Sequence, residues 1–246
     1  MNSRRGLGRW TWVGIGGYVC ALMTAGVGPL SAQVVNPGPI RARTPVLLVP
    51  GWSDGGDELV ALRDRFVEAG WSPESVAIVD FRDPVGSNRE HAREIALAAA
   101  ALRVTAGTSR IDMVAHSMGG LAVRYHLRHR ASPMADVRRV VFLATPHFGT
   151  YSSLVAWGEG AREMYPGSDF LLTLMEGRPI PDEIDAVTIR TPLDLHILPP
   201  ESAIIPGVPD LQICCPTHAG LLDDPGVFDR IVGFLQEQDG PGAGDP

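Results

Sequence analysis

The chain has 246 residues, of which 45% are apolar, and a formal net charge of −7. This composition is sufficient for one substantial globular core, and the acidic balance argues against nucleic acid as a partner. Every basic residue is an arginine, which excludes a lysine nucleophile and the lysine of a P-loop. The three cysteines form no CxxC zinc pattern, and we expect neither a metal nor a cofactor.

The first 32 residues differ from the rest of the chain. Residues 1–9 contain three arginines and no acid, and residues 10–30 are uncharged and mostly apolar. Because Leu30-Ser31-Ala32 ends in a small residue suited to cleavage, we predict a secretory signal peptide over residues 1–32; the alternative is an uncleaved membrane anchor. Ser3-Arg4-Arg5 resembles a twin-arginine signal, which leaves the export route open. Loss of the three arginines changes the formal charge to −10, and we expect a secreted, periplasmic or cell-envelope protein.

From Thr44 onward, short apolar runs alternate with longer amphipathic ones, as in βαβ units of a parallel sheet. The pattern predicts strands over residues 45–49, 75–81, 110–116, 137–144, 186–191 and 210–214. It predicts helices over residues 57–69, 87–106, 118–129 and 225–236. The expected fold is α/β, with a mostly parallel sheet of about six strands and helices on both faces. One catalytic domain would span residues 33–238, followed by a disordered tail over residues 239–246.

Two details of this pattern bear on the site. Ser87 is the expected N-cap of the second helix, with Glu90 three residues later and Gly107 at its end. Residues 151–185 break the alternation, and an insertion of this length between strands is more often functional than not. We therefore expect a lid-like segment that covers or borders the site. Its apolar run Phe170–Met175 fits either a wall for an acyl chain or the core face of an ordinary helix.

The stretch "IDMVAHSMGGL" places Ser117 where the third strand ends and the third helix begins. A tight turn of this kind strains the serine backbone and exposes its hydroxyl, and small residues two positions before and after it prevent collision. Gly119 is one of them, and Ala115 stands where glycine is usual. The alternative is that Ser117 only caps the helix. Its place at the carboxyl end of a parallel strand favours a nucleophile.

A serine nucleophile of this type needs an acid and then a histidine later in the chain. His218 lies in the loop between the last strand and the last helix, where the base is expected. His126 and His129 are interleaved with arginines and are expected on a solvated face, and His147 precedes every suitable acid. Asp194 directly follows the fifth strand and is the predicted acid. Asp223 and Asp224 are expected to cap a helix.

Two backbone N–H groups should form an oxyanion hole for the developing negative charge. One donor is Met118, which follows the nucleophile. We assign the other to Trp52, in the glycine-rich loop of residues 50–56 after the first strand.

Cys214 and Cys215 are neighbours in the chain. Because α-carbons across a trans peptide lie about 3.8 Å apart, below the usual disulfide range, we predict two free, partly buried thiols.

Together these segments resemble the small secreted bacterial lipases and esterases of the α/β-hydrolase superfamily. The likeness covers about residues 44–235 and rests on the order of the blocks LLVPGW, VAHSMGGLAVRY, VVFLATPHFGT, PGSDFLLTL, TIRTPLDLHILPPESAIIPG and THAGLL. Some minimal lipases of this group carry the same Ala-His-Ser-Met-Gly, whereas Pro50, in place of the usual histidine, and the paired cysteines depart from the family pattern.

The resemblance implies a triad of Ser117, Asp194 and His218, with the oxyanion hole at Trp52 and Met118. It implies an exported hydrolase of carboxylic esters of lipids, either a triacylglycerol lipase or a carboxylesterase, with a hydrophobic ester as substrate and transient contact with a lipid–water interface. The alternatives are an acyltransferase or polyester depolymerase that uses the same triad, and a catalytically silent binding module on a hydrolase scaffold.

Overall fold

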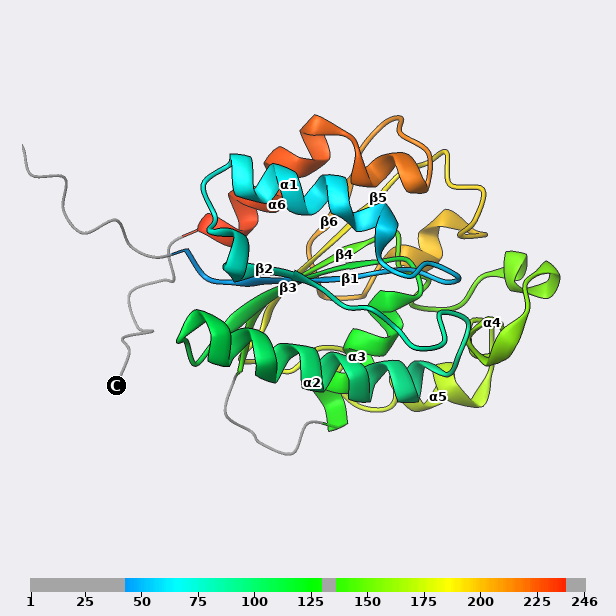
Figure 1. The fold of residues 1–246 in the computed structure, drawn as a ribbon. Helices are drawn as coiled ribbons and strands as arrows, with labels where there is room; N and C mark the ends of the chain where they lie inside the picture. Colours follow the sequence, from blue (N-terminus) through cyan, green and yellow to red (C-terminus); the bar gives the residue numbers. More distant parts are fainter. Residues whose placement is uncertain (1–42, 130–135, 238–246) are drawn as a thin grey trace, which may run out of the picture. The chain divides into compact units, whose positions relative to one another are not determined.

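The computed structural model describes residues 43–129 and 136–237. The predicted signal peptide and the predicted disordered tail lie outside the described residues. Within those residues, no helix combines the length and the apolar character that a membrane span requires. Figure 1 shows a central sheet with helices on both faces.

The sheet has six strands in the order β2-β1-β3-β4-β5-β6. All five pairings are parallel. The strands are β1 (Val46–Val49), β2 (Val76–Ile78), β3 (Ile111–His116), β4 (Val137–Leu143), β5 (Asp185–Arg190) and β6 (Asp210–Gln212). The predicted parallel α/β fold is confirmed, and the carboxyl ends of β1, β3 and β5 lie along one edge of the sheet.

The helices form one layer on each face of the sheet (Figure 1). Those on one face are α1 (Val60–Glu68) and α6 (Pro225–Gln236). Those on the other face are α2 (Asn88–Ala106) and α3 (Gly119–His129). Alternate residues of the buried strands supply the two cores, since Leu47 packs with α2 and α3 and Leu48 with α1 and α6.

The N-terminus of α2 is capped by an acidic residue of the inserted segment, Glu163, and not by Glu90 of α2 itself. Ser87 accepts a hydrogen bond from the Arg89 amide, as an N-cap does, and Gly107 ends the helix in the left-handed region at φ 63°. The buried carboxylate of Glu163 accepts from the amide of Asn88 at 2.6 Å and from the hydroxyl of Ser87 at 2.8 Å. Glu90, expected in this position, is exposed and pairs with Arg93.

The inserted segment of residues 151–185 contains four elements or parts of them. They are the 3-10 helix η3 (Tyr151–Val155), α4 (Gly158–Glu163), α5 (Asp169–Met175) and the first residue of β5. Phe170, Leu171 and Leu174 of α5 are buried against Met118 and Leu121. Phe170, Leu171 and Leu174 therefore form the core face of a helix, whereas Leu172 and Met175 of the same apolar run are 50% and 41% exposed.

Two local expectations are wrong. His126 of α3 is buried rather than solvated, and so is Arg124, because α3 is enclosed by α2 and the inserted segment. His129, the last residue of α3, is exposed as expected. Arg124 and Arg128 donate hydrogen bonds to the carbonyl oxygen of Leu174 near the end of α5, at 2.9 and 3.0 Å.

The second concerns the cysteines. Cys214 and Cys215 are joined in a disulfide instead of remaining free thiols. The peptide bond between them is cis, with the two α-carbons 2.9 Å apart, so the spacing of a trans peptide does not apply.

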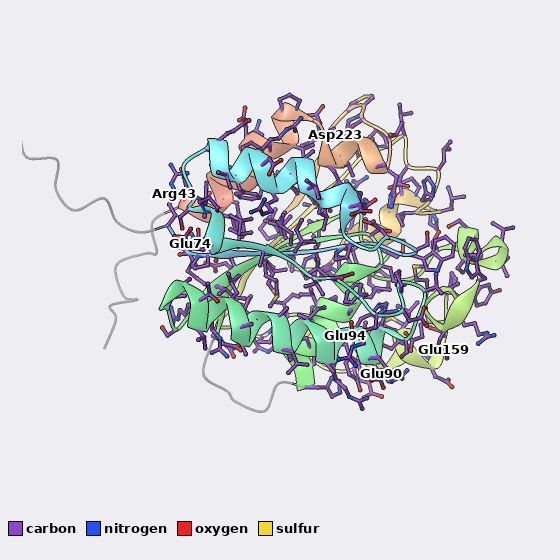
Figure 2. The ribbon with its side chains drawn as sticks, in the orientation of Figure 1. Arg43, Glu74, Glu90, Glu94, Glu159 and Asp223 are labelled. Carbon is purple, nitrogen blue, oxygen red and sulfur yellow. A yellow bond between two sulfur atoms is a disulfide. The ribbon has the colours of Figure 1, made fainter. Side chains whose placement is uncertain are left out.

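Exposed acidic side chains lie on several separate parts of the described residues. Exposed acidic side chains project from separate elements around the sheet, as labelled in Figure 2: Glu74, Glu90, Glu159 and Asp223.

Candidate active site

Ser117 occupies the sharp turn between β3 and α3. Its backbone has φ 50°, in the left-handed region that non-glycine residues rarely adopt. The Ser117 amide donates to the carbonyl oxygen of Leu143 on β4 at 2.8 Å, which fastens the turn to the sheet. The strained turn that the sequence predicts is therefore present, with the backbone conformation that presents a side chain above the strand ends.

The close approach at this turn depends on Gly119. A β-carbon added there would lie 2.2 Å from the carbonyl oxygen of Pro50 and 2.9 Å from a methyl group of Val49. Ala115, in contrast, is fully buried within the core formed with α2 and α3, where its methyl group is accommodated. The turn therefore tolerates alanine two residues before Ser117 but requires glycine two residues after it.

His218 and Asp194 meet although they belong to different loops. Nδ1 of His218 lies 2.8 Å from Oδ2 of Asp194, and both side chains are buried. The other carboxylate oxygen, Oδ1, accepts from the amides of His196 and Ile197, each at 2.8 Å. Three hydrogen bonds thus orient the carboxylate, and the carboxylate in turn orients the imidazole.

The electrostatics of this pair suit a general base. Burial would raise the pKa of Asp194, but the hydrogen bond and charge of His218 and the two amides outweigh it and lower the pKa of Asp194. Burial lowers the pKa of His218 below 6.5; the hydrogen bond that His218 donates to Asp194 opposes this shift, and His116 and His196 reinforce it. The aspartate therefore stays ionised and the histidine is neutral near pH 7, the form that can accept a proton.

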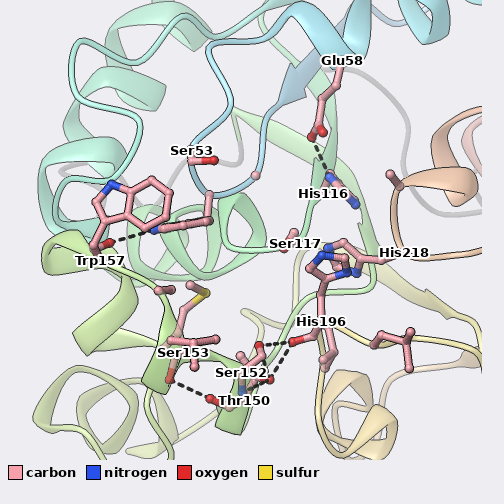
Figure 3. Close-up of a pocket in the computed structure, with 18 residues that line it drawn as sticks. Ser53, Glu58, His116, Ser117, Thr150, Ser152, Ser153, Trp157, His196 and His218 are labelled. Atoms are coloured by element: carbon pink, nitrogen blue, oxygen red, sulfur yellow. Dashed lines mark hydrogen bonds and ion pairs between the residues drawn. The ribbon is translucent and has the colours of Figure 1, made fainter.

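Ser117 and His218 line one pocket of about 510 Å³. Figure 3 shows it bounded by the loop after β1 and by residues of the inserted segment. The inserted segment contributes Ser152, Ser153, Val155, Ala156, Trp157 and Met164. The segment thus borders the site, as expected, and its role as a lid stays a prediction.

The loop after β1 runs beside the nucleophile. A β-carbon on Gly51 would lie 3.1 Å from Cβ of Ser117, so the next residue, Trp52, is close to the reacting centre. The indole of Trp52 lines the pocket, donates to the carbonyl oxygen of Trp157 at 3.0 Å and packs edge-on against its ring. Met118 is fully buried directly after Ser117. Both predicted oxyanion donors are therefore next to Ser117 in space, and their amide roles stay predictions.

Asp194, His196 and His218 form a group that could hold a metal ion, because one ligand atom of each lies within 4.8 Å of the others. The carboxylate of Asp194 is already engaged by three donors, and one of them is Nδ1 of His218. A metal would have to break that hydrogen bond, so the arrangement suits a base and its orienting acid better than a metal site.

Sequence reasoning did not identify a second imidazole in the site. His116, the last residue of β3, is buried, lines the pocket and has its ring centroid 4.7 Å from that of His218. Its Nδ1 lies 2.7 Å from Oε1 of Glu58. Adjacency to Ser117 is the one sequence signal for His116, and nothing local indicates Glu58, which is 58 residues away.

His147 lies outside this constellation, as the chain order suggests. It is fully buried, and its ring packs edge-on against Phe142. Among the described residues, neither ring nitrogen of His147 has a hydrogen-bond partner. Burial and then the charge of Arg124 lower the pKa of His147 well below 6.5, so this histidine is a neutral core residue.

Solved structures with low sequence identity share this architecture. Lipase B of Aspergillus fumigatus has a TM-score of 0.70 at 18% identity, over 80% of this chain and 53% of that one. This chain therefore spans about half the length of that lipase. The mature lipase BlEst2 of Bacillus licheniformis has a TM-score of 0.67 at 14% identity, over 81% and 94% of the two chains. The metagenomic carboxyl esterase MGS0156 has a TM-score of 0.56 at 19% identity, over 77% and 68%.

A family match covers the centre of the chain. Residues 92–161 match the family described as "Putative serine esterase (DUF676)". This stretch runs from within α2 through the Ser117 turn and β4 into α4. The chain therefore has the α/β-hydrolase fold, and the segment that presents Ser117 is similar to a family of serine esterases.

Proposed function

We propose that this protein is an exported serine hydrolase that cleaves carboxylic esters of lipids. The observation that carries the proposal is the strained turn at Ser117 in the same pocket as the hydrogen-bonded pair of His218 and Asp194. The serine esterase match and the shared fold of lipases and esterases support ester hydrolysis. Export rests on the composition of residues 1–32.

In the proposed reaction, Oγ of Ser117 attacks the ester carbonyl while Nε2 of His218 accepts the hydroxyl proton. Asp194 keeps His218 in the tautomer with the proton on Nδ1 and stabilises the imidazolium that forms. The amides of Trp52 and Met118 stabilise the oxyanion. His218 then returns the proton to the departing alcohol, and water releases the acid from the acyl-enzyme by the reverse steps.

Apolar side chains around the pocket favour a lipid substrate over a polar ester. Val155, Leu195 and Trp157 line the pocket and are also 88%, 79% and 63% exposed. Exposed apolar groups at a pocket mouth are costly in water and gain free energy on contact with an acyl chain or a lipid surface. This arrangement supports transient contact with a lipid–water interface during hydrolysis.

The test compares wild type with Ser117→Ala on soluble short-chain p-nitrophenyl esters and on emulsified triglyceride. We expect Ser117→Ala to lose both activities and covalent labelling by a fluorophosphonate. A triglyceride rate that rises sharply above the solubility limit would identify a lipase, and its absence an esterase. Retained activity in Ser117→Ala, or no labelling of the wild type, would overturn the serine mechanism and favour a binding module. Ester formation with an added alcohol would identify an acyltransferase instead.

A further inference from the structure

The pair of Glu58 and His116 joins the loop after β1 to the strand that presents the nucleophile. Glu58 belongs to the 3-10 helix η1 (Asp57–Leu59), which closes that loop, and His116 ends β3 directly before Ser117. Oε1 of Glu58 and Nδ1 of His116 are 2.7 Å apart, and the imidazole is 3% exposed. Figure 3 shows the His116 ring between Glu58 and the triad histidine.

Glu58 is the ionised acceptor of this hydrogen bond. Burial would raise the pKa of Glu58, but the hydrogen bond and charge of His116, with smaller contributions from Asp54 and the Gly51 amide, lower it to about 2. Nδ1–H of His116 is therefore the donor. A charge-assisted hydrogen bond to a partly buried carboxylate is stronger than a neutral one.

The same carboxylate also engages the start of the loop. The Gly51 amide helps to lower the pKa of Glu58, and a β-carbon on Gly51 would lie 3.6 Å from Oε1 of Glu58 and 3.1 Å from Cβ of Ser117. Gly51 precedes Trp52, the predicted oxyanion donor. Glu58 thus contacts the loop beside Trp52 and the residue before Ser117 at once.

The loop needs such an anchor because regular structure does not hold it. Between β1 and η1 the loop contains Gly55 and Gly56, and Ser53 has φ 59° in the left-handed region. The amide of Ser53 donates to the carbonyl oxygen of Pro84, and the indole of Trp52 donates to the carbonyl oxygen of Trp157. Glu58 adds a contact on the side of the loop where Gly51 approaches Ser117. Misplacement of a donor by about 1 Å can reduce a rate roughly 100-fold.

We propose that Glu58 and His116 are positioning residues that fix the oxyanion loop, residues 50–56, against the Ser117 turn. This inference rests on the proposed function. Glu58 acts through the loop and through His116, and neither residue exchanges a proton with the substrate. The pair keeps the Trp52 amide at the position from which it and the Met118 amide can donate to the same oxyanion. Loss of the pair should therefore weaken stabilisation of the transition state more than binding of the ester.

The experiment measures kcat and KM for a soluble short-chain ester, with kcat expressed per active site counted by fluorophosphonate labelling at its end point. We expect Glu58→Ala to lower kcat about 10- to 100-fold and to change KM less than about twofold. Glu58→Gln should recover part of the loss, because its amide oxygen accepts from the same N–H groups without the charge. The matched control is Asp57→Ala, which removes the neighbouring exposed carboxylate and should leave kcat unchanged.

A double-mutant cycle tests whether Glu58 and His116 act through one linkage, and the melting temperature of each variant reports any loss of stability. His116→Phe keeps an aromatic ring but removes the Nδ1–H donor, and it should lower kcat as Glu58→Ala does. Glu58→Ala combined with His116→Phe should cost little more than either change alone, since both break one linkage. Unchanged kcat per labelled site, with only a lower melting temperature, would overturn the inference. If Ser117→Ala is inactive while Glu58→Ala is fully active, the inference fails and the proposed function stands.

Discussion

Asp194 and His218, 24 residues apart in the chain, are joined by a 2.8 Å hydrogen bond between Oδ2 and Nδ1. The bond assigns the proton to Nδ1 and leaves Nε2 free to accept a proton. Asp194→Asn would keep the shape but remove the charge and permit the wrong tautomer. We expect kcat to fall by about 10³- to 10⁴-fold, with the fold unchanged by circular dichroism.

The control for this prediction is Asp223→Asn, since Asp223 is exposed and lies much closer to His218 in sequence. Its kcat should equal that of the wild type. A large loss in Asp223→Asn with normal activity in Asp194→Asn would show that the acid has been assigned to the wrong residue.

Gly119→Ala should be strongly unfavourable, because the added β-carbon would lie 2.2 Å from the carbonyl oxygen of Pro50. We expect the free energy of unfolding to fall by about 1–3 kcal/mol and the activity to fall with it, since Pro50 begins the oxyanion loop. Urea unfolding followed by tryptophan fluorescence measures the change.

Gly233→Ala is the matched control for Gly119→Ala. Gly233 lies inside α6, and an added β-carbon there meets nothing within 4 Å. This change should raise the free energy of unfolding by about 0.5–1 kcal/mol through helix propensity. Equal effects of the two substitutions would refute the close contact at the turn.

His147 should make the protein less stable in acid. Its folded-state pKa is well below 6.5, so its contribution to stability is complete above pH 6.5 and is lost as the pH falls below that value. The unfolded chain takes up a proton that the folded chain cannot, which costs about 1.4 kcal/mol per pH unit. In His147→Leu, the slope of unfolding free energy against pH should be shallower by this amount. Parallel slopes for the two proteins would show that His147 accepts a proton in the folded state.

The apolar pocket rim predicts a difference between dispersed and soluble substrates. Val155→Ser and Leu195→Ser should lower the rate on emulsified triglyceride several-fold while changing the rate on a soluble short ester little. Val104→Ser is the control, because Val104 is 83% exposed at the far end of α2 and is not part of the pocket. Equal losses for rim and control variants would argue against contact with a lipid surface.

The elements and the turn at Ser117 follow from local sequence. Apolar runs that alternate with amphipathic ones predict all six strands, because the period of side-chain burial is a property of each segment. The turn is predictable for the same reason, since its strand, serine and glycines are consecutive. Even Asp194 and His218 could be selected from chain order and position after strands, because parallel strands present their carboxyl ends at one edge.

The sequence by itself determined the parallel α/β scaffold and the residues that stand at its strand ends, because both depend on short-range patterns. Only the tertiary structure decided what those residues meet. Contacts between distant segments place Glu58 on His116, Glu163 on the start of α2 and Arg124 beneath α5. These buried charged groups require interaction partners on other elements, and no local sequence pattern specifies which residue is the partner. The same long-range packing brings side chains of the inserted segment to the border of the pocket that contains Ser117.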